Sequence, residues 1–217
     1  MESTVSSEAT GRPAVQVWLR EAITSGEFVP GQRLIEADLV SLLGVSRNVV
    51  RLALDALVAD GLVERIPNRG ARVRRVSTAE AVAITECRMA LEGLIAAKAA
   101  QHATDAEIAE LHAGVRRMRE AVRAGELVRY SALIHELHQL IRQAARQPTA
   151  AALIERLQAQ IVRHQFRLSL RPGRPQVSLA GLTAVVSAIA ARDPEAAEMA
   201  ARTHLSSVIT ALSEKGA

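Results

Sequence analysis

Apolar residues recur with the period of a helix in the first part of the chain. A first helix is expected to begin near Pro13 and to end at Gly26, because the apolar positions between them fall on one side: Val15, Trp18, Leu19, Ala22 and Ile23. Two shorter helices are predicted over residues 36–43 and 47–59, and residues 33–35 are compatible with a short strand.

The helix predicted over residues 47–59 has two chemically different faces. One face is apolar and comprises Val50, Ala53, Leu54, Leu57 and Val58. The opposite face carries Arg47, Asn48, Arg51 and Asp55. Ser46 directly precedes the helix, where its hydroxyl can cap the first free N–H groups. Such a helix packs on the protein with one side and offers hydrogen-bonding groups with the other.

The period then changes from that of a helix to that of strands. Residues 62–66 and 71–76 are rich in β-forming side chains and flank the turn sequence Pro67-Asn68-Arg69-Gly70, so a hairpin is expected. Three helices followed by a hairpin predict a winged helix-turn-helix.

From Ser77 onward the pattern is helical. Ser77 with Glu80, and Thr104 with Glu107, have the spacing of capping boxes. About six helices are expected, near residues 78–101, 105–124, 126–146, 149–170, 177–191 and 195–213. We therefore predict a mainly α fold with a disordered tail over residues 1–12, a winged helix-turn-helix over 13–76 and an all-helical bundle over 77–217.

Composition narrows the classes of protein. Hydrophobic residues make up 49% of the chain but aromatic residues only 2%, which favours helices over a sandwich or barrel. A single cysteine, Cys87, excludes an internal disulfide framework and a thiolate metal cluster. Residues 1–12 are polar rather than a signal peptide, and no apolar run approaches the length of a membrane span. We expect a cytoplasmic protein with no membrane partner.

Arginine supplies almost all of the positive charge, and its placement indicates two anionic partners. The chain has a net charge of +4, and residues 47–75 carry seven arginines against three acids. Residues 156–192 contain six arginines and no acid. The alternative is that these arginines only form solvated helix faces.

The first basic region has the residues of a DNA-reading surface. Arg47 and Arg51 can each bond a guanine edge, and Asn48 can pair with adenine. Ser46 and the backbone N–H groups beside it can hold a phosphate. The hairpin tip is suited to the minor groove or the DNA backbone and comprises Asn68, Arg69 and Gly70. The alternative is a helix-turn-helix that serves only in dimerisation or protein binding.

Four motifs in this region resemble the GntR family of bacterial transcription regulators. They are residues 26–34 (Gly-Glu-Phe-Val-Pro-Gly-Gln-Arg-Leu), 43–47 (Leu-Gly-Val-Ser-Arg), 60–64 (Asp-Gly-Leu-Val-Glu) and 67–71 (Pro-Asn-Arg-Gly-Ala). The resemblance implies a DNA-binding regulator. Val49 and Leu52 stand where the family commonly has Pro and Glu, which affects the base preference rather than the fold.

The rest of the chain resembles the all-helical effector domain (FCD domain) of the fatty-acid-regulator-like, or FadR-type, branch of that family. The motifs are residues 88–92 (Arg-Met-Ala-Leu-Glu), 137–138 (Leu-His), 188–193 (Ala-Ile-Ala-Ala-Arg-Asp) and 203–205 (Thr-His-Leu). The resemblance implies a homodimer that holds a metal or a small carboxylate-bearing effector in the centre of the bundle.

Three polar residues interrupt apolar stripes of the predicted helices. Arg88, His138 and His204 each stand among aliphatic residues at helical spacing. A buried cation or imidazole needs a partner, and a bound anion or metal is one candidate. The alternatives are an ion pair of Arg88 with Glu92 and histidines that are satisfied within the core.

The residues around these histidines argue against a metal. Ile134 and Leu182 stand where metal-binding members of the family usually carry ligands. We therefore expect no metal and no cofactor. A site made from His138 and His204 with His135 is the alternative.

A second cluster of arginines offers an anion site. Arg163, Arg167 and Arg171 follow one another at intervals of four residues, where like charges repel unless an anion lies among them. We expect Arg88, Arg163 and Arg167 to hold an anionic effector together with His138 and His204. An outer face or a dimer contact is the alternative.

These features favour a dimeric transcription regulator that binds a near-palindromic DNA operator and responds to a small anionic metabolite. The alternatives are a regulator that has lost its effector and acts constitutively, and a helical scaffold for protein interactions. No nucleophile elbow, phosphate loop or carboxylate pair indicates an enzyme.

Overall fold

A computed structural model describes residues 12–66 and 70–214 of the chain. The chain divides into two compact units, of which the first ends at Val76 and the second begins at Ser77. In the described part, no helix combines the length and the apolar character that a membrane crossing needs.

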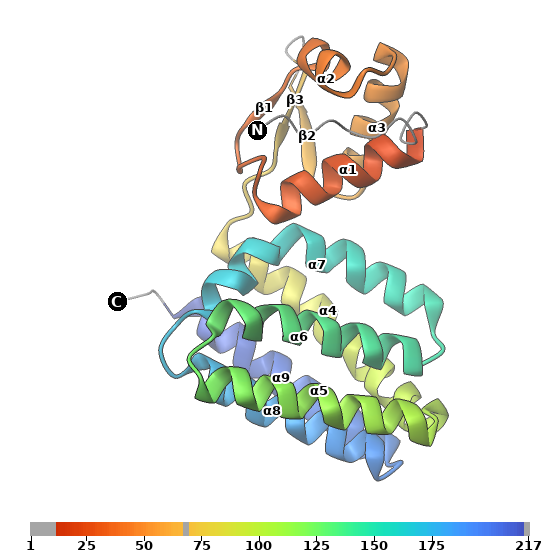
Figure 1. The fold of residues 1–217 in the computed structure, drawn as a ribbon, viewed down its shortest axis with the longest axis vertical. Coiled ribbons are helices and arrows are strands. Elements are labelled where there is room, and N and C mark those ends of the chain that lie inside the picture. Colours follow the sequence, from red (N-terminus) through yellow and green to blue (C-terminus); the bar gives the residue numbers. More distant parts are fainter. Residues whose placement is uncertain (1–11, 67–69, 215–217) are drawn as a thin grey trace. The chain divides into compact units, whose positions relative to one another are not determined.

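The first unit consists of three helices and a small antiparallel sheet (Figure 1). Its elements are α1 (Arg12–Ser25), β1 (Arg33–Leu34), α2 (Glu36–Leu43), α3 (Arg47–Ala59), β2 (Val63–Ile66) and β3 (Gly70–Val73). The strand order is β1-β3-β2, with Arg33 opposite Arg72 and Val63 opposite Val73. This arrangement confirms the predicted winged helix-turn-helix.

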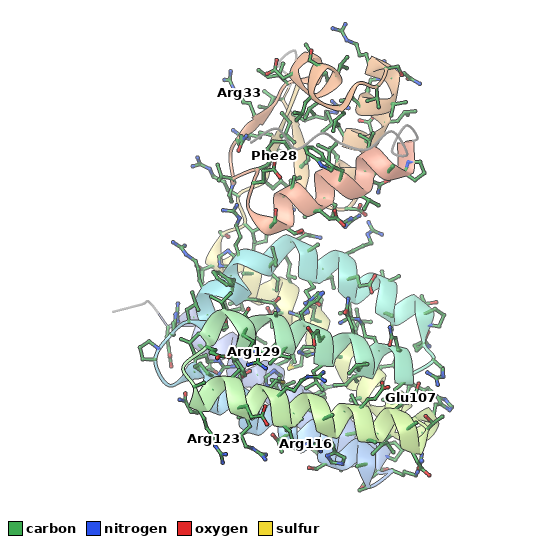
Figure 2. All side chains as sticks on the ribbon, in the orientation of Figure 1. Phe28, Arg33, Glu107, Arg116, Arg123 and Arg129 are labelled. Carbon is green, nitrogen blue, oxygen red and sulfur yellow. The ribbon has the colours of Figure 1, made fainter. Side chains whose placement is uncertain are left out.

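The core of the first unit comes from the apolar stripes that the sequence shows. Leu19 of α1, Leu54 and Leu57 of α3, and Val63 of β2 are almost fully buried. Phe28, labelled in Figure 2, meets Trp18 edge to face with ring centroids 5.8 Å apart. The stripes therefore place the opposite, polar face of α3 at the surface.

The second unit is a bundle of six helices, within the residues that the structure describes (Figure 1). They are α4 (Thr78–His102), α5 (Asp105–Arg123), α6 (Leu127–Ala144), α7 (Pro148–Ser169), α8 (Arg174–Ala190) and α9 (Pro194–Ser213). α4 packs most extensively against α9, which also packs on α8. Ser77 accepts a hydrogen bond from the Glu80 N–H, and Thr104 with Glu107 forms a complete capping box.

Several boundaries differ from those that the sequence predicts. α8 begins at Arg174 rather than near residue 177, because Pro175 falls in the first turn, where a helix does not need the missing N–H. Gly173, with a φ of 77°, makes the turn that precedes it. The strands of the hairpin are shorter than expected and cover residues 63–66 and 70–73.

Candidate nucleic-acid interface and effector site

The turn between α2 and α3 presents the start of α3 at the surface. Gly44 ends α2 in the left-handed conformation, with a φ of 65°. Ser46 then caps α3, and its Oγ accepts a hydrogen bond from the Val49 N–H at 3.4 Å. Buried Val50 and Leu54 fix the rotation of α3 about its axis.

The predicted reading residues gather on the exposed face of α3. Ser46, Arg47, Asn48 and Arg51 are all exposed, and Asp55 lies on the same face. Asn48 Oδ1 accepts a hydrogen bond from Arg51 Nη2 at 3.0 Å. This bond holds the Arg51 guanidinium over the first turn of the helix.

Of the predicted hairpin tip, only Gly70 can be placed. Gly70 has a φ of 83°, and a Cβ at this position would lie 3.2 Å from the Leu34 carbonyl oxygen of β1. The position therefore favours glycine for structural reasons. The other two predicted residues, Asn68 and Arg69, lie outside the described residues.

Sequence reasoning missed the side chain that joins the hairpin to the helices. Arg65 of β2 donates to Asp55 Oδ1 from Nη2 at 2.6 Å and from Nε at 3.1 Å. It also donates from Nη1 to Glu36 Oε1 and from Nη2 to the Arg51 carbonyl, each at 3.1 Å. The basic character of the hairpin was visible in the sequence, but these partners are separated from Arg65 by 10 to 29 residues.

In the helical unit, three predicted residues come together around a carboxylate. Arg88 is 2% exposed and donates from Nη2 to Glu92 Oε1, so the alternative ion pair forms. His138 Nδ1 lies 3.3 Å from the other carboxylate oxygen, Glu92 Oε2. The His138 and His204 rings have centroids 6.3 Å apart. A buried polar cluster thus links α4, α6 and α9.

The charges in this cluster are set by burial and by Arg88. Burial raises the pKa of Glu92, but Arg88 and the two histidines outweigh it and lower that pKa to about 2. Burial lowers the pKa of His138 to about 4, against the opposing effect of Glu92, and that of His204 to about 3. At neutral pH, Glu92 is therefore ionised and both histidines are neutral.

Beside the cluster lies a cavity of about 20 Å³, enough for one or two water molecules. Its polar lining comprises Glu92, His138, Arg142 and His204, and its apolar lining includes Ile95, Leu182, Val185 and Leu205. Gly181 lets α8 approach this wall, because a Cβ there would lie 2.7 Å from His204 Nδ1.

Arg142 is a charged residue of the cavity wall that the sequence analysis did not single out. Its side chain is 5% exposed, and burial lowers its pKa. The Glu155 carboxylate lies 3.9 Å from Nε, beyond hydrogen-bond distance. Within the described residues, Arg142 Nη1, Arg88 Nε and Nη1, and His204 Nδ1 are buried without a hydrogen-bond partner. The sequence did contain a signal for this residue, because Arg142 follows His138 by four residues and so lies on the same face of the helix.

The other predicted anion-binding arginines lie away from this cavity. The inward stripe of α7 runs through Ile154, Gln158, Ile161 and Leu168, so Arg163 is half-buried and Arg167 is exposed on other faces. Arg171 donates to the Ala211 carbonyl at the end of α9. The three arginines follow one another at intervals of four residues, but α7 packs so that none of them lines the cavity.

The metal alternative finds little support in the donor set. His135 Nδ1 lies 3.0 Å from Gln158 Nε2 and is engaged with α7. Leu182, 1% exposed, fills part of the wall beside His204. Within residues 12–66 and 70–214, no group of three or more His, Cys, Asp or Glu side chains is arranged to hold a metal ion.

Two family models match the chain, and together they span both units. The model of bacterial regulatory proteins of the gntR family matches residues 14–73. The FCD domain model matches residues 83–207, more than half of the chain.

Curated relatives extend over most of the chain. The HTH-type transcriptional repressor RspR of Escherichia coli K12 is 30% identical over 190 residues, which cover 88% of this chain and 83% of that protein. The HTH-type transcriptional repressor NanR of Salmonella newport is 27% identical, over 89% of this chain and 82% of that protein.

Solved structures share the fold of the chain. Escherichia coli McbR/YncC superposes with a TM-score of 0.76 at 23% identity, over 93% of this chain and 96% of that one. A putative transcriptional regulator GntR from Rhodococcus sp. RHA1 gives a TM-score of 0.72 at 25% identity, over 94% and 99% of the two chains.

The relatives and the matched models are those of transcription regulators, not of enzymes. Both matched regions coincide with the units described above, the first with the helix-turn-helix and its hairpin and the second with the six-helix bundle. The chain therefore belongs to the GntR family, as a DNA-binding transcription regulator with a C-terminal FCD domain.

Proposed function

We propose that the protein is a dimeric regulator whose affinity for a near-palindromic operator changes when a small monocarboxylate binds in the helical unit. The observation that carries the proposal is the Arg142 guanidinium, which is buried on the wall of the cavity with an unpartnered Nη1 within the described residues. Buried charges in proteins are normally paired, so the Arg142 guanidinium is suited to bind an anion.

The DNA-reading part of the proposal rests on α3. Arg47 and Arg51 offer guanidinium forks to guanine edges, and Asn48 offers an amide to adenine. Ser46 offers a phosphate contact at the helix N-terminus. The hairpin tip serves the minor groove or the DNA backbone through Asn68, Arg69 and Gly70.

The net charge of the buried cluster favours a ligand with a single negative charge. Two guanidinium groups, Arg88 and Arg142, face one ionised carboxylate, Glu92, and two neutral histidines. One positive charge is left in excess in a buried place, and the nearby carboxylate of Glu155 is itself exposed. A ligand with a single negative charge balances this excess, whereas a dianion leaves a buried negative charge.

The small volume and the lining of the cavity favour a short carboxylate. A planar carboxylate accepts two parallel hydrogen bonds from a guanidinium such as that of Arg142. His204 Nδ1 can supply or accept a further bond. Aliphatic walls formed by Ile95, Leu182 and Val185 suit a short apolar tail, and the small cavity admits only a few atoms without movement of these side chains.

A divalent metal does not fit this set of residues. Glu92, the carboxylate at the site, is already bonded to Arg88 and lies against His138. Aliphatic Leu182 occupies the wall where a further ligand is needed, and two guanidinium groups repel a cation. We therefore propose that the charge of Arg142 takes the place of a metal ion in anchoring the ligand.

Calorimetric titration of the purified full-length protein with acetate, propionate, butyrate and lactate tests the ligand class. We expect saturable binding of at least one acid, no binding of its methyl ester and loss of binding in Arg142→Met. Arg129→Gln removes an exposed arginine of the same helix, paired with Glu126, and is expected to bind normally. About one zinc, nickel or manganese per chain in untreated protein, lost in His204→Ala, would overturn the metal-free site.

The dimer is proposed from family membership and from the surface of the helical unit. Large apolar side chains are exposed there, among them Val128, Val177 and Met199. A two-fold dimer that covers such residues would place two α3 helices on the two halves of a palindrome.

A further inference from the structure

The guanidinium of Arg65 connects the hairpin to α2 and α3 of the DNA-binding unit. Arg65 belongs to β2, its partner Glu36 opens α2, and its partners Asp55 and the Arg51 carbonyl belong to α3. Two donors of Arg65 bond the same oxygen of Asp55, Oδ1, from Nη2 at 2.6 Å and from Nε at 3.1 Å. A planar fork with several fixed donors suits such a junction better than the flexible ammonium of lysine.

The period of the strand explains why this side chain reaches the helices. Val63 and Arg65 are two residues apart on β2 and so project to the same face. Val63 is 1% exposed in the core, which directs Arg65 toward α3. Its cross-strand neighbour is Ala71, whose small side chain leaves room for the guanidinium.

Arg65 also controls the charge of the proposed DNA-facing surface. Asp55 lies on the same exposed face of α3 as Arg47 and Arg51. A free carboxylate at this place repels DNA phosphates, and Glu36 adds a second negative charge nearby. In the structure both carboxylates are bonded to Arg65, whose Nε, Nη1 and Nη2 are all engaged in these bonds.

We propose that Arg65 is a positioning residue for operator recognition, which fixes α3 against the hairpin and α2 and neutralises Asp55, without contacting DNA itself. The inference rests on the proposal above that α3 reads the operator. It differs from the roles proposed for Arg47 and Arg51, because Arg65 acts through Asp55, Glu36 and the backbone of α3.

The hairpin offers a matched control. Arg72 of β3 donates from Nε to Glu64 Oε1 at 2.6 Å, so this pair stays within the hairpin. Arg72→Gln removes the same charge and the same kind of bond from the same sheet. It leaves the connection between the hairpin and α3 intact.

The experiment measures affinity for two duplexes by fluorescence anisotropy across a range of salt concentrations. One duplex is the sequence that the wild-type full-length protein selects from randomised DNA, and the other is a scrambled duplex of the same composition. The proteins are wild type, Arg65→Gln, Asp55→Asn, the double variant Arg65→Gln/Asp55→Asn, Arg72→Gln and Arg51→Ala.

We expect Arg65→Gln to weaken binding of the selected duplex about tenfold or more, and Arg72→Gln to weaken it less than about threefold. Asp55→Asn in the Arg65→Gln background is expected to recover much of the loss, because it removes the unpaired carboxylate. The slope of log affinity against log salt should stay that of wild type in Arg65→Gln.

A direct phosphate contact by Arg65 predicts different results and would overturn the inference. Arg65→Gln would then cause the same loss of affinity whether or not Asp55→Asn is also present. The slope of log affinity against log salt would also become less steep by about 0.9. An effect of Arg65→Gln no larger than that of Arg72→Gln would also overturn it. If Arg51→Ala binds the selected duplex like wild type, the assignment of α3 itself fails, independently of Arg65.

Asp55→Asn with Arg65 intact decides the question if Arg65→Gln does not fold. A positioning role predicts a lower ratio of specific to non-specific affinity, because the neutral amide oxygen of asparagine accepts the two bonds from Arg65 more weakly than the carboxylate does. A role of Arg65 as a phosphate contact predicts that both affinities rise together and that the ratio stays constant. The second outcome overturns the inference.

Discussion

Arg142 combines a cost in stability with a proposed role in binding. A guanidinium that is buried with an unpartnered Nη1, as the described residues leave it, is unfavourable compared with an apolar side chain of similar length. Proteins commonly accept such strain at sites of function rather than elsewhere. Replacing Arg142 with an apolar residue is therefore expected to raise the stability of the protein and to abolish its response to the ligand.

We expect Arg142→Met to raise the stability of the ligand-free protein by about 1 kcal/mol or more, because it removes a buried charge that lacks a full partner. The same variant should lose any rise in melting temperature caused by the short carboxylates. Differential scanning calorimetry with and without the acids measures both effects. A lower melting temperature of ligand-free Arg142→Met would show instead that the arginine holds the bundle together.

His204 and His138 make the stability of the helical unit depend on pH. Their pKa values in the folded protein, about 3 and about 4, lie below the ordinary value of 6.5, because burial disfavours the charged imidazoles. As pH falls below 6.5, the unfolded chain takes up protons before the folded one does. The contribution of these two histidines to stability is therefore fully present above about pH 6.5. It is lost as the pH falls toward their pKa values in the folded protein.

Urea unfolding between pH 7 and pH 5 measures this dependence. Each histidine is expected to add up to about 1.4 kcal/mol per pH unit to the slope of stability against pH. His204→Leu removes one of the two groups and should give a clearly shallower slope than wild type. An unchanged slope in this variant would mean that His204 titrates normally in the folded protein.

At the scale of the element, α3 shows how one helix serves two purposes. Its apolar stripe through Val50, Leu54 and Leu57 closes the core, and the cap by Ser46 sets where the helix begins. These features hold the exposed arginines of the other face in fixed positions. Side chains presented by a fixed helix lose less freedom on binding DNA.

We expect Arg47→Ala and Arg51→Ala each to weaken operator binding, and Arg51→Ala to cost about 1–3 kcal/mol if its fork reads a guanine. The base preference should relax at one position of the operator. Selection from randomised DNA followed by affinity measurement tests this. Arg123→Ala, an exposed arginine of α5 labelled in Figure 2, removes the same charge from the helical unit and should leave the preference unchanged.

At the scale of the whole molecule, the proposed dimer links two reading helices. Full-length protein is expected to sediment as a dimer and to bind a duplex with two half-sites about one helical turn apart far more tightly than one half-site. Affinity should fall steeply with salt, because arginine–phosphate contacts release counterions. A monomer at working concentration that binds one half-site as tightly as two would contradict this prediction.

Local signals were sufficient to predict most of the elements. The helical periods predicted α1 to α7 and α9 closely, and the fold class and family are confirmed. The cap at Ser46 and the capping box of Thr104 and Glu107 were visible because their partners are three residues apart. The start of α8 was placed too late, because a proline can end one segment or open the next.

The roles of single polar side chains depended on contacts between elements. Arg163 and Arg167 have the spacing of an anion site, yet the rotation of α7 directs them away from the cavity. Sequence reasoning did not single out Arg142, although it lines that cavity. Asn68, Arg69 and the other proposed DNA contacts stay predictions.

The sequence by itself determined which segments form helices and strands, approximately where most of them lie, and which of their faces are apolar. These properties depend on neighbours within one or two helical turns. Only the tertiary structure decided that Arg65 bonds Asp55 and Glu36 and that Arg142 faces His138, His204 and Glu92. Such juxtapositions join residues far apart in the chain, and they follow from how the apolar faces pack together.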